Sequence, residues 1–267
     1  MSLNAETQEK HPDVREDLQS VGVTNLRTIV ETKWKGKIYR FTPTIEITVD
    51  LPREKKGVHM SRLVESITEI LEEETLGAHT SFEEIQRSIL DRLAKKHPYK
   101  KGRIIFQTEL VVAAKTPVTG KTTMEAHEVE VEVSRTESSW QKRLKVKVLG
   151  NTVCPHALKN NKGKTHIQRA VGTLEIETVF DNPIELEDMI KTVECSFPSP
   201  VYTLLKSDDE NFVVETMYDN PMFVEDVTRN MISAAKKKYG NSDIFVSVVS
   251  EESIHRHDVK AEAYAKT

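Results

Sequence analysis

The sequence predicts an α+β protein built of two modules, each an antiparallel sheet with helices packed on one face. Two kinds of segment predict this class: β-branched runs in which apolar and polar residues alternate, and longer runs with an apolar residue every three or four positions. The second half repeats the element order of the first, although no sequence identity between the halves is visible. With 267 residues, the chain is long enough for two domains of ~130 residues. We therefore expect a partly mobile N-terminal segment over 1–36, a first module over 37–138 and a second module over 139–267.

The first module is expected to begin with a strand. Residues 37–51 alternate and are rich in β-branched side chains, and Pro43 marks a break or an edge position. The preceding residues 18–30 contain Gly22 and predict a loop and a short strand or turn. A helix is predicted over 60–75 because its apolar positions recur with a helical period, at Leu63, Ile67, Ile70 and Leu71.

A second helix follows in the first module. Gly77 is expected to end the preceding helix, and Thr80 and Ser81 are both candidates for the new N-cap. The apolar stripe of the second helix is Phe82, Ile85, Ile89, Leu90 and Leu93, and the helix is expected to end before Pro98. Strands over 103–114 and 122–133 come next, joined by a hairpin-like turn around Gly120.

The second module shows a similar order of elements. Its predicted strands cover 144–149, 167–179 and, as the final strand, 243–250. Helices are predicted from Pro183 to Cys195 and from Pro221 to Tyr239, because proline favours the first helical turn. Gly240 is the expected C′ residue of the latter helix, and residues 202–206 are expected to form a short helix.

The composition argues against several functional classes. The net charge of −4 is too small to steer the protein toward nucleic acid, and the apolar runs are too short to span a membrane. The first residues do not have the pattern of a signal peptide. The two cysteines, Cys154 and Cys195, do not make a disulfide scaffold, so the cytoplasm is the expected location.

Side chains that suit metal binding gather in two places. Cys154, His156 and His166 lie between two predicted strands, and thiolate with imidazole suits a borderline-soft metal such as zinc or ferrous iron. A second cluster lies near the C-terminus: Glu251, Glu252, His255, His257 and Asp258. Glu252 and His255 are three residues apart, which predicts that they share one side of a helical turn. The same spacing is equally compatible with an inert cysteine and solvated surface histidines.

Several segments spread over the whole chain are specific when taken together. They read PDVREDLQSVGVTNLR, VDLPREKKGVHMSR, KTPVTGK, GNTVCPHALKN with THIQRA, PVYTLLKSDDENFVVE, NPMFVEDVTR and EESIHRHD. Together they resemble the GTP cyclohydrolases of type IB and type IV, and VGVTNL and KTPVTGK are more similar to the archaeal type IV enzymes. The resemblance implies the tunnelling fold (T-fold) with two modules per chain. It also implies a homo-oligomer, a dimer or tetramer, with active sites at the subunit interfaces.

The resemblance further implies a reaction and a metal. Enzymes of this kind open the guanine ring of GTP at C8 and release formate. The type IV product is 7,8-dihydroneopterin 2′,3′-cyclic phosphate, an early intermediate of archaeal, methanopterin-type pterin biosynthesis; the type IB product, 7,8-dihydroneopterin triphosphate, is the alternative. One divalent metal per subunit is implied, with Fe²⁺ expected first and Zn²⁺ or Mn²⁺ as alternatives. Its implied ligands are Cys154, His166, Glu252 and His255. The catalytic candidates are Cys154 and, for proton transfer or support of the metal shell, His156 and His257.

The substrate suggests a further set of residues. Glu215 is the implied anchor for guanine, because a carboxylate can accept hydrogen bonds from N1–H and the exocyclic amine together. The triphosphate needs cations or backbone N–H groups. The candidates for this role are His59, Ser61, Arg62, Lys115, Lys121, Arg169 and Lys206. Each of them has an ordinary alternative as a solvated surface group.

Two positions depart from the type IB pattern. This chain has His156 where those enzymes commonly have the second cysteine of Cys-Pro-Cys, and Pro200 where they carry a glutamate. A metal-binding glutamate therefore cannot be carried over at Pro200, and the complete metal shell stays open. An alternative of another class is a T-fold protein that binds a purine or pterin without catalysis.

Overall fold

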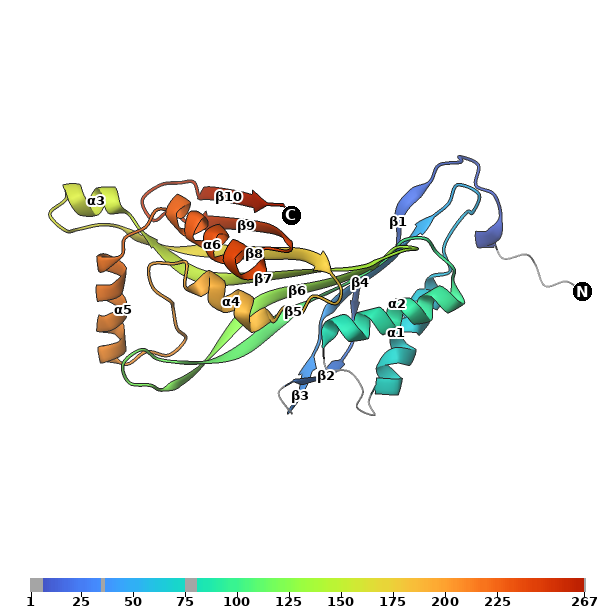
Figure 1. The fold of residues 1–267 in the computed structure, drawn as a ribbon, viewed down its shortest axis with the longest axis horizontal. Helices are drawn as coiled ribbons and strands as arrows, with labels where there is room; N and C mark the ends of the chain where they lie inside the picture. The colour runs from blue at the N-terminus through green and yellow to red at the C-terminus, as the bar shows by residue number, and fades with distance from the viewer. Residues whose placement is uncertain (1–6, 35–36, 75–80, 267) are drawn as a thin grey trace, which may run out of the picture. The chain divides into compact units, whose positions relative to one another are not determined.

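The computed structural model describes residues 7–34, 37–74 and 81–266 (Figure 1). They form two compact units, and each unit is drawn from two separate stretches of the chain. Unit 1 comprises Met1–Thr108 and Glu130–Arg143, and unit 2 comprises Glu109–Val129 and Leu144–Thr267. Three long strands contribute residues to both units: β5 (Gly102–Lys115), β6 (Thr122–Arg135) and β7 (Trp140–Val153). The predicted module boundary at 138/139 lies in the turn between β6 and β7 and stays a prediction.

Unit 1 is built on an antiparallel sheet and two packed helices. In chain order its elements are the 3₁₀ helix Thr7–Glu9, β1 (Leu18–Arg27), β2 (Val30–Trp34), β3 (Lys37–Phe41), β4 (Thr44–Leu51), α1 (Met60–Glu74) and α2 (Phe82–Lys96). β4 pairs with β1 and with β5, while β2 and β3 form a separate two-stranded sheet. The break predicted at Pro43 is confirmed, because it separates β3 from β4.

The two helices of unit 1 pack through the apolar stripes that predicted them. Leu63 of α1 and Ile85 and Ile89 of α2 are completely buried. The hydroxyl of Ser81 accepts a hydrogen bond from the N–H of Glu84 at 3.3 Å, so Ser81 is the N-cap of α2, as predicted. The predictions for Gly77 and Thr80 fall outside the described residues.

Strand β1 corrects the prediction for residues 18–30. This segment is not mainly a loop, because Leu18–Arg27 forms a ten-residue strand paired with β4. Gly22 makes the pairing possible: a Cβ atom there would lie 1.9 Å from the carbonyl oxygen of Ile47. The glycine marks a close approach of two backbones, whereas the sequence predicted a loop and a short strand or turn around it.

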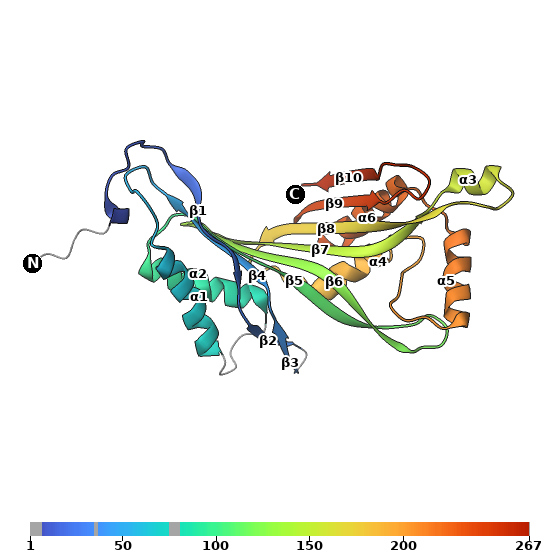
Figure 2. The same ribbon diagram turned by 180° about the vertical axis from the view of Figure 1, so that it is seen from behind.

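Unit 2 is built on a second part of the antiparallel sheet with helices on one face. Its further elements are α3 (Pro155–Asn160), β8 (Ile167–Val179), α4 (Leu186–Glu194), α5 (Ser207–Asp219), α6 (Val224–Tyr239), β9 (Asp243–Ser250) and β10 (Val259–Ala265). β9 pairs with β8 on one side and β10 on the other. Figures 1 and 2 show α4 and α6 on the same face of β8 and β9. The buried layer between them includes Leu174, Val193, Val227, Met231 and Val246, each with no exposed surface.

Several predicted boundaries in unit 2 are wrong. α4 begins at Leu186 instead of Pro183, and α6 begins at Val224 instead of Pro221. For α6 the start is set by a capping interaction, since the carboxylate of Asp226 accepts the N–H of Phe223 at 3.2 Å. Gly240 is the C-cap itself in a right-handed conformation (φ −61°), not a left-handed C′ residue.

Two further predictions in unit 2 are wrong. Residues 202–206 form no helix, and the helical segment begins after them, at Ser207. Strand β9 is not the last strand of the chain, because Val259–Ala265 forms β10 beside it. In β10 small alanines alternate with Lys260, Glu262 and Tyr264, and this weak pattern did not predict a strand.

Two buried carboxylates, Asp209 and Glu125, hydrogen-bond the β5–β6 hairpin to the start of α5 and the segment before it. Asp209 accepts hydrogen bonds from the N–H groups of Val118 (2.9 Å) and Thr119 (2.8 Å) and from the Thr119 hydroxyl (2.6 Å). Desolvation would raise the pKa of Asp209, but these hydrogen bonds outweigh it and hold the pKa well below its ordinary range. Glu125 of β6 likewise accepts the N–H and hydroxyl of Thr203. The turn between β5 and β6 is therefore attached to the start of α5.

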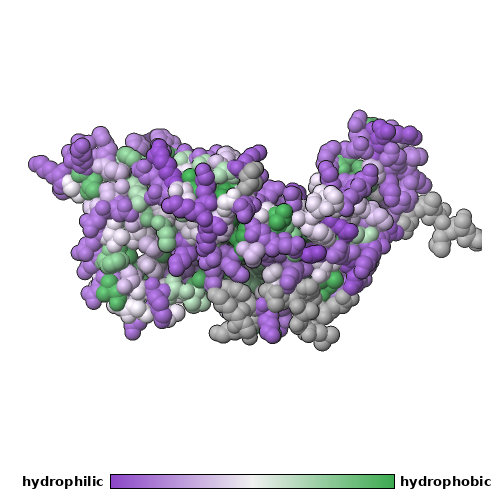
Figure 3. Space-filling view, in the orientation of Figure 1, coloured by the Kyte–Doolittle hydropathy of each residue, from purple (hydrophilic) through white to green (hydrophobic). Residues whose placement is uncertain are grey.

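These elements confirm the predicted fold class. The strand pairs named above are antiparallel, and the strand order of the sheet is β1-β4-β5-β6-β7-β8-β9-β10. The face of the molecule in Figure 3 is mostly hydrophilic, with small separate hydrophobic areas. Across residues 7–34, 37–74 and 81–266, no helix combines the length and apolar character needed to cross a membrane.

Candidate functional site

One pocket in unit 2 collects the residues predicted to bind a metal. Its volume is about 280 Å³. All four predicted ligands line it, Cys154, His166, Glu252 and His255, and so does a further predicted catalytic residue, His257. The remaining lining residues are Thr152, Gln168, Met222, Phe223, Val224, Glu225 and Val259. They come from the end of β7, the start of β8, the start of α6 and the segment joining β9 to β10.

Cys154 lies where β7 ends and α3 begins. The sequence predicted no helix between the two strands here, but Pro155–Asn160 forms a short helix with Cys154 as its N-cap. The sulfur accepts a hydrogen bond from the N–H of Ala157 at 3.4 Å. The N–H of Cys154 donates to the carbonyl of His166 at 3.4 Å, so the backbones that carry these two predicted ligands are joined directly.

His166 and Glu252 are joined by one intervening side chain. The amide of Gln168 bonds His166 Nδ1 through Oε1 (2.9 Å) and Glu252 Oε1 through Nε2 (3.2 Å). The same Nε2 donates to the hydroxyl of Thr152 at 2.8 Å. The hydroxyl of Ser250 also donates to Glu252 Oε1 at 3.1 Å. The two predicted ligands therefore belong to a single hydrogen-bonded network.

His255 and His257 are exposed side chains at the edge of the pocket. Their rings are stacked, with centroids 5.2 Å apart and an interplanar angle of 10°. The prediction that Glu252 and His255 share a helical turn is wrong, because 251–258 is an irregular connection between β9 and β10. The two residues still line one pocket. They lie in the short connection between β9 and β10, and the antiparallel pairing of these strands keeps that connection compact.

The donor atoms of the pocket fit a borderline-soft divalent metal by their chemistry. A thiolate, two imidazoles and a carboxylate are ligand types that zinc and ferrous iron accept. Among the described residues, no three His, Cys, Asp or Glu side chains come close enough together to hold one ion. The pocket therefore gathers suitable donors around one space without forming a closed coordination shell within the chain.

The predicted substrate residues of unit 2 lie outside this pocket. Glu215 is exposed on α5, and Lys206 is exposed just before that helix. Lys115 and Lys121 are exposed at the two ends of the β5–β6 turn. Because Asp209 bonds this turn to the start of α5, the three lysines belong to connected segments.

Two other predicted residues of unit 2, His156 and Arg169, are exposed and lie close in sequence to residues that line the pocket. His156 lies in the first turn of α3, and Asn160 Nδ2 donates to its carbonyl at 2.9 Å. Arg169 follows Gln168 on β8, and its carbonyl accepts the N–H of Glu251 at 2.9 Å. Neither side chain lines the pocket.

The predicted phosphate-binding residues of unit 1 lie around the start of α1. His59 is buried, and its Nε2 lies 3.3 Å from Oε1 of Glu9. Ser61 is exposed and Arg62 is half-buried in the first turn of the helix. His59 thus faces a carboxylate, which would compete with a phosphate for the same imidazole nitrogen.

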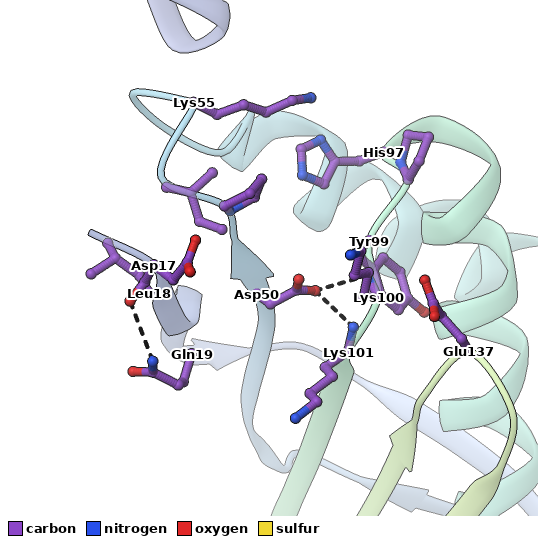
Figure 4. Close-up of a pocket in the computed structure, with 13 residues that line it drawn as sticks. Asp17, Leu18, Gln19, Asp50, Lys55, His97, Tyr99, Lys100, Lys101 and Glu137 are labelled. Carbon is purple, nitrogen blue, oxygen red and sulfur yellow. Dashed lines mark hydrogen bonds between the residues drawn. The ribbon is translucent and has the colours of Figure 1, made fainter. Parts of the chain in front are cut away.

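A second pocket, in unit 1, contains none of the predicted site residues (Figure 4). Its volume is about 550 Å³. Within it, Asp50 accepts the N–H groups of Lys100 (2.9 Å) and Lys101 (2.7 Å). Desolvation lowers the pKa of His97 and raises the pKa of Tyr99 to about 12, so both are neutral at pH 7. The pocket is lined by three acidic side chains and three lysines, so its charge favours no ligand class.

Sequence reasoning missed Met222, Phe223, Val224, Glu225 and Val259 of the pocket lining. It also missed the two lining residues that belong to the hydrogen-bonded network, Gln168 and Thr152. Both are polar residues at strand ends, and neither is a metal ligand or an ionisable group. One signal was available: Gln168, in the predicted strand 167–179, is two residues after His166, and residues two apart in an extended chain point to the same side. The contact with Glu252 depends on pairing across 84 residues of sequence and has no local signature.

Known sequences give a consistent match. The family described as type I GTP cyclohydrolase folE2 matches residues 5–261. A protein of Pyrococcus abyssi named GTP cyclohydrolase MptA is 54% identical over 267 residues, which covers 98% of this chain and 100% of that protein. A protein of the same name from Thermococcus kodakarensis is 52% identical over 265 residues, covering 97% and 99%. One from Methanosphaera stadtmanae is 32% identical, covering 97% and 94%.

Solved structures agree in fold at low sequence identity. Uricase from Arthrobacter globiformis superimposes with a TM-score of 0.57 at 9% identity, covering 96% of each chain. A hyper-thermostable mutant of AgUricase gives a TM-score of 0.55 at 9% identity, covering 94% and 92%. This likeness shows the fold alone, and it confirms the prediction of tandem T-fold modules.

Proposed function

The chain belongs to the type I GTP cyclohydrolase family described as folE2, and on this basis we propose that it is itself a GTP cyclohydrolase. One observation carries the proposal. The chain is 54% identical, almost end to end, to the Pyrococcus abyssi protein named GTP cyclohydrolase MptA. The pocket of thiolate, imidazole and carboxylate side chains in unit 2 supplies a place for the chemistry.

The proposed reaction opens guanine at C8 and removes that carbon as formate. Two water molecules supply the two oxygens of the formate, and one water is released when the ring is rebuilt with carbons of the ribose. In the type IV version, the 2′,3′-cyclic phosphate forms as pyrophosphate leaves, which gives 7,8-dihydroneopterin 2′,3′-cyclic phosphate. The sequence similarity to proteins named MptA supports this version over the one that retains the triphosphate.

The proposed metal ligands are Cys154, His166, Glu252 and His255. A divalent ion bound there would lower the pKa of water to about 7 and make hydroxide available at neutral pH. Fe²⁺ is the proposed ion, with Zn²⁺ or Mn²⁺ as substitutes, since the same donors accept all three. His257 lines the same pocket, and we assign it proton transfer. His156, on the exposed side of α3, keeps the same proposed role.

The proposed substrate contacts require more than one subunit. Glu215 would accept the two N–H groups of guanine, while the cations around the β5–β6 turn and α5 would bind phosphate. Glu215 is exposed and lies outside the pocket of its own chain. A homo-oligomer, in which a neighbouring subunit brings its own Glu215 to this pocket, would complete the site.

Product analysis tests the proposal. Metal-stripped protein is incubated anaerobically with GTP after separate addition of Fe²⁺, Mn²⁺ or Zn²⁺, and the products are separated by mass. Formate with a dihydroneopterin cyclic monophosphate is the expected result with iron. Formate with dihydroneopterin triphosphate would support cyclohydrolase activity but overturn the type IV assignment. Absence of formate with every metal would overturn the proposed cyclohydrolase activity and favour the alternative of a T-fold protein that binds a purine or pterin without catalysis.

A further inference from the structure

The amide orientation of Gln168 is determined by its partners. Glu252 as a carboxylate only accepts hydrogen bonds, so the atom of Gln168 that faces it at 3.2 Å has to be the NH₂ group. The same NH₂ group donates to the hydroxyl of Thr152 at 2.8 Å. Both of its hydrogens are therefore used, and the oxygen of the amide is directed to His166.

This orientation selects one tautomer of His166. The amide oxygen can only accept, so Nδ1 of His166 has to carry the proton in their 2.9 Å hydrogen bond. Nε2 of the neutral ring is then the unprotonated nitrogen with an available lone pair. A metal binds imidazole through such a lone pair.

The same side chain also fixes Glu252. Oε1 of Glu252 accepts hydrogen bonds from Gln168 and from the hydroxyl of Ser250. The hydroxyl oxygens of Ser250 and Thr152 lie 3.0 Å apart, and each residue is 1% exposed. The two hydroxyls that hydrogen-bond Glu252 and Gln168 are therefore buried. Among the described residues, Oε2 of Glu252 has no hydrogen-bond partner.

We propose that Gln168 is a positioning residue that presents two atoms to the metal, Nε2 of His166 and Oε2 of Glu252. The inference rests on the proposed metal-dependent function and deepens it, because it assigns a supporting role to a residue that binds neither metal nor substrate. Groups that hydrogen-bond to metal ligands hold them in one tautomer and one orientation.

The first test measures the tautomer without any metal. Long-range ¹H–¹⁵N NMR of the metal-free protein, at a mildly alkaline pH where imidazoles are neutral, reports which ring nitrogen carries the proton. The His166 signals are identified by their loss in His166→Ala. We expect Nδ1–H in the wild type and a shift toward Nε2–H in Gln168→Leu. Nε2–H in the wild type would overturn the inference, whether or not the protein binds metal.

The second test measures metal affinity. Cobalt(II) is titrated into the metal-free protein, where thiolate-to-cobalt absorption reports binding at Cys154. Gln168→Leu is expected to weaken binding by about 10- to 100-fold. Gln168→Glu keeps an acceptor for His166 but repels Glu252; it is expected to keep the Nδ1–H tautomer and still lose affinity. Thermal melts confirm that each variant is folded.

Gln107→Leu is the matched control. Gln107 is also a strand glutamine that donates to a glutamate, with Nε2 2.7 Å from Oε2 of Glu130, but it contacts no predicted ligand. Its cobalt affinity should equal that of the wild type. Equal affinity in folded Gln168→Leu would overturn the positioning role. Failure of the wild type to bind cobalt at all would instead contradict the metal-dependent function, while the tautomer result would stand by itself.

Discussion

The sulfur of Cys154 has two roles, and the effects of Cys154→Ala on metal binding and on stability distinguish them. Its sulfur caps α3 through the N–H of Ala157, and it is the proposed thiolate ligand of the pocket. Cys154→Ala should therefore lose most of the bound metal and most of the turnover, with a folded protein, because one N-cap contributes only about 1 kcal/mol. Metal content by mass spectrometry and formate release from GTP are the measurements. Cys195→Ala is the control, since that cysteine is exposed and outside the pocket. Full metal content with normal turnover in Cys154→Ala would contradict the ligand assignment.

Glu215 offers a test that separates substrate binding from metal binding. Glu215→Ala removes the proposed bidentate acceptor for guanine, and hydrogen bonds to a charged group are worth enough to weaken GTP binding by ~10- to 100-fold. Metal content should stay unchanged. Equilibrium binding of GTP to the metal-loaded protein measures the effect. Glu210→Ala is the matched control, because Glu210 is another exposed acid of α5. A Glu215→Ala protein that loses metal and binds GTP normally would reverse the assignment.

The four proposed ligands were predictable because they are chemically distinctive. Cys154, His166, Glu252 and His255 stand out by residue type and by resemblance, and the fold brings all four to one pocket. Gln168 has no such distinction. Its role is visible only once the pairing of β8 with β9 brings it to Glu252.

At the scale of elements, Asp209 controls how the β5–β6 turn meets α5. Its pKa is depressed in the folded state, so its contribution to stability is fully present above the unfolded pKa of about 3.9 and is lost as the pH falls through the lower folded value. Asp209→Asn should lower the urea midpoint at neutral pH, and the difference from wild type should shrink in acid. Asp208→Asn, an exposed neighbour in the same helical turn, should change the midpoint little at either pH. If Asp209→Asn lowers the urea midpoint by the same amount at neutral and acidic pH, the charge of Asp209 is not the source of its stabilising effect.

The elements that were predicted correctly have strong local patterns. α2 has an apolar stripe with Ser81 before it, and β8 has the predicted bounds 167–179 because its alternation is regular. β1 and β10 were missed or underestimated because their evidence is not local. β1 depends on Gly22 lying against β4, and β10 depends on pairing with β9. The predicted start of α6 was wrong because the capping contact of Asp226 is a stronger signal than proline tolerance. No side-chain cap marks the start of α4.

At the scale of the whole molecule, the proposed site needs parts from two chains. Cys154→Ala and Glu215→Ala should each have little activity alone when GTP is below the level that saturates Glu215→Ala. After subunit exchange in a one-to-one mixture, a dimer should recover roughly a quarter of wild-type activity, because half of the assemblies are mixed and each restores one site of two. Formate release measures the recovery, and differently tagged subunits confirm the exchange. Proven exchange without recovery would show that both residues act within one chain.

The three strands shared by the two units limit how such a gene can recombine. β5, β6 and β7 cross from one unit to the other, so the stretch from Gly102 to Val153 passes between them repeatedly. A crossover between two homologous genes inside this stretch would join strand halves that evolved with different neighbours. Chimeras with junctions before β5 or after β7 keep every strand intact, and we expect inheritance in this family to preserve the central stretch as one block.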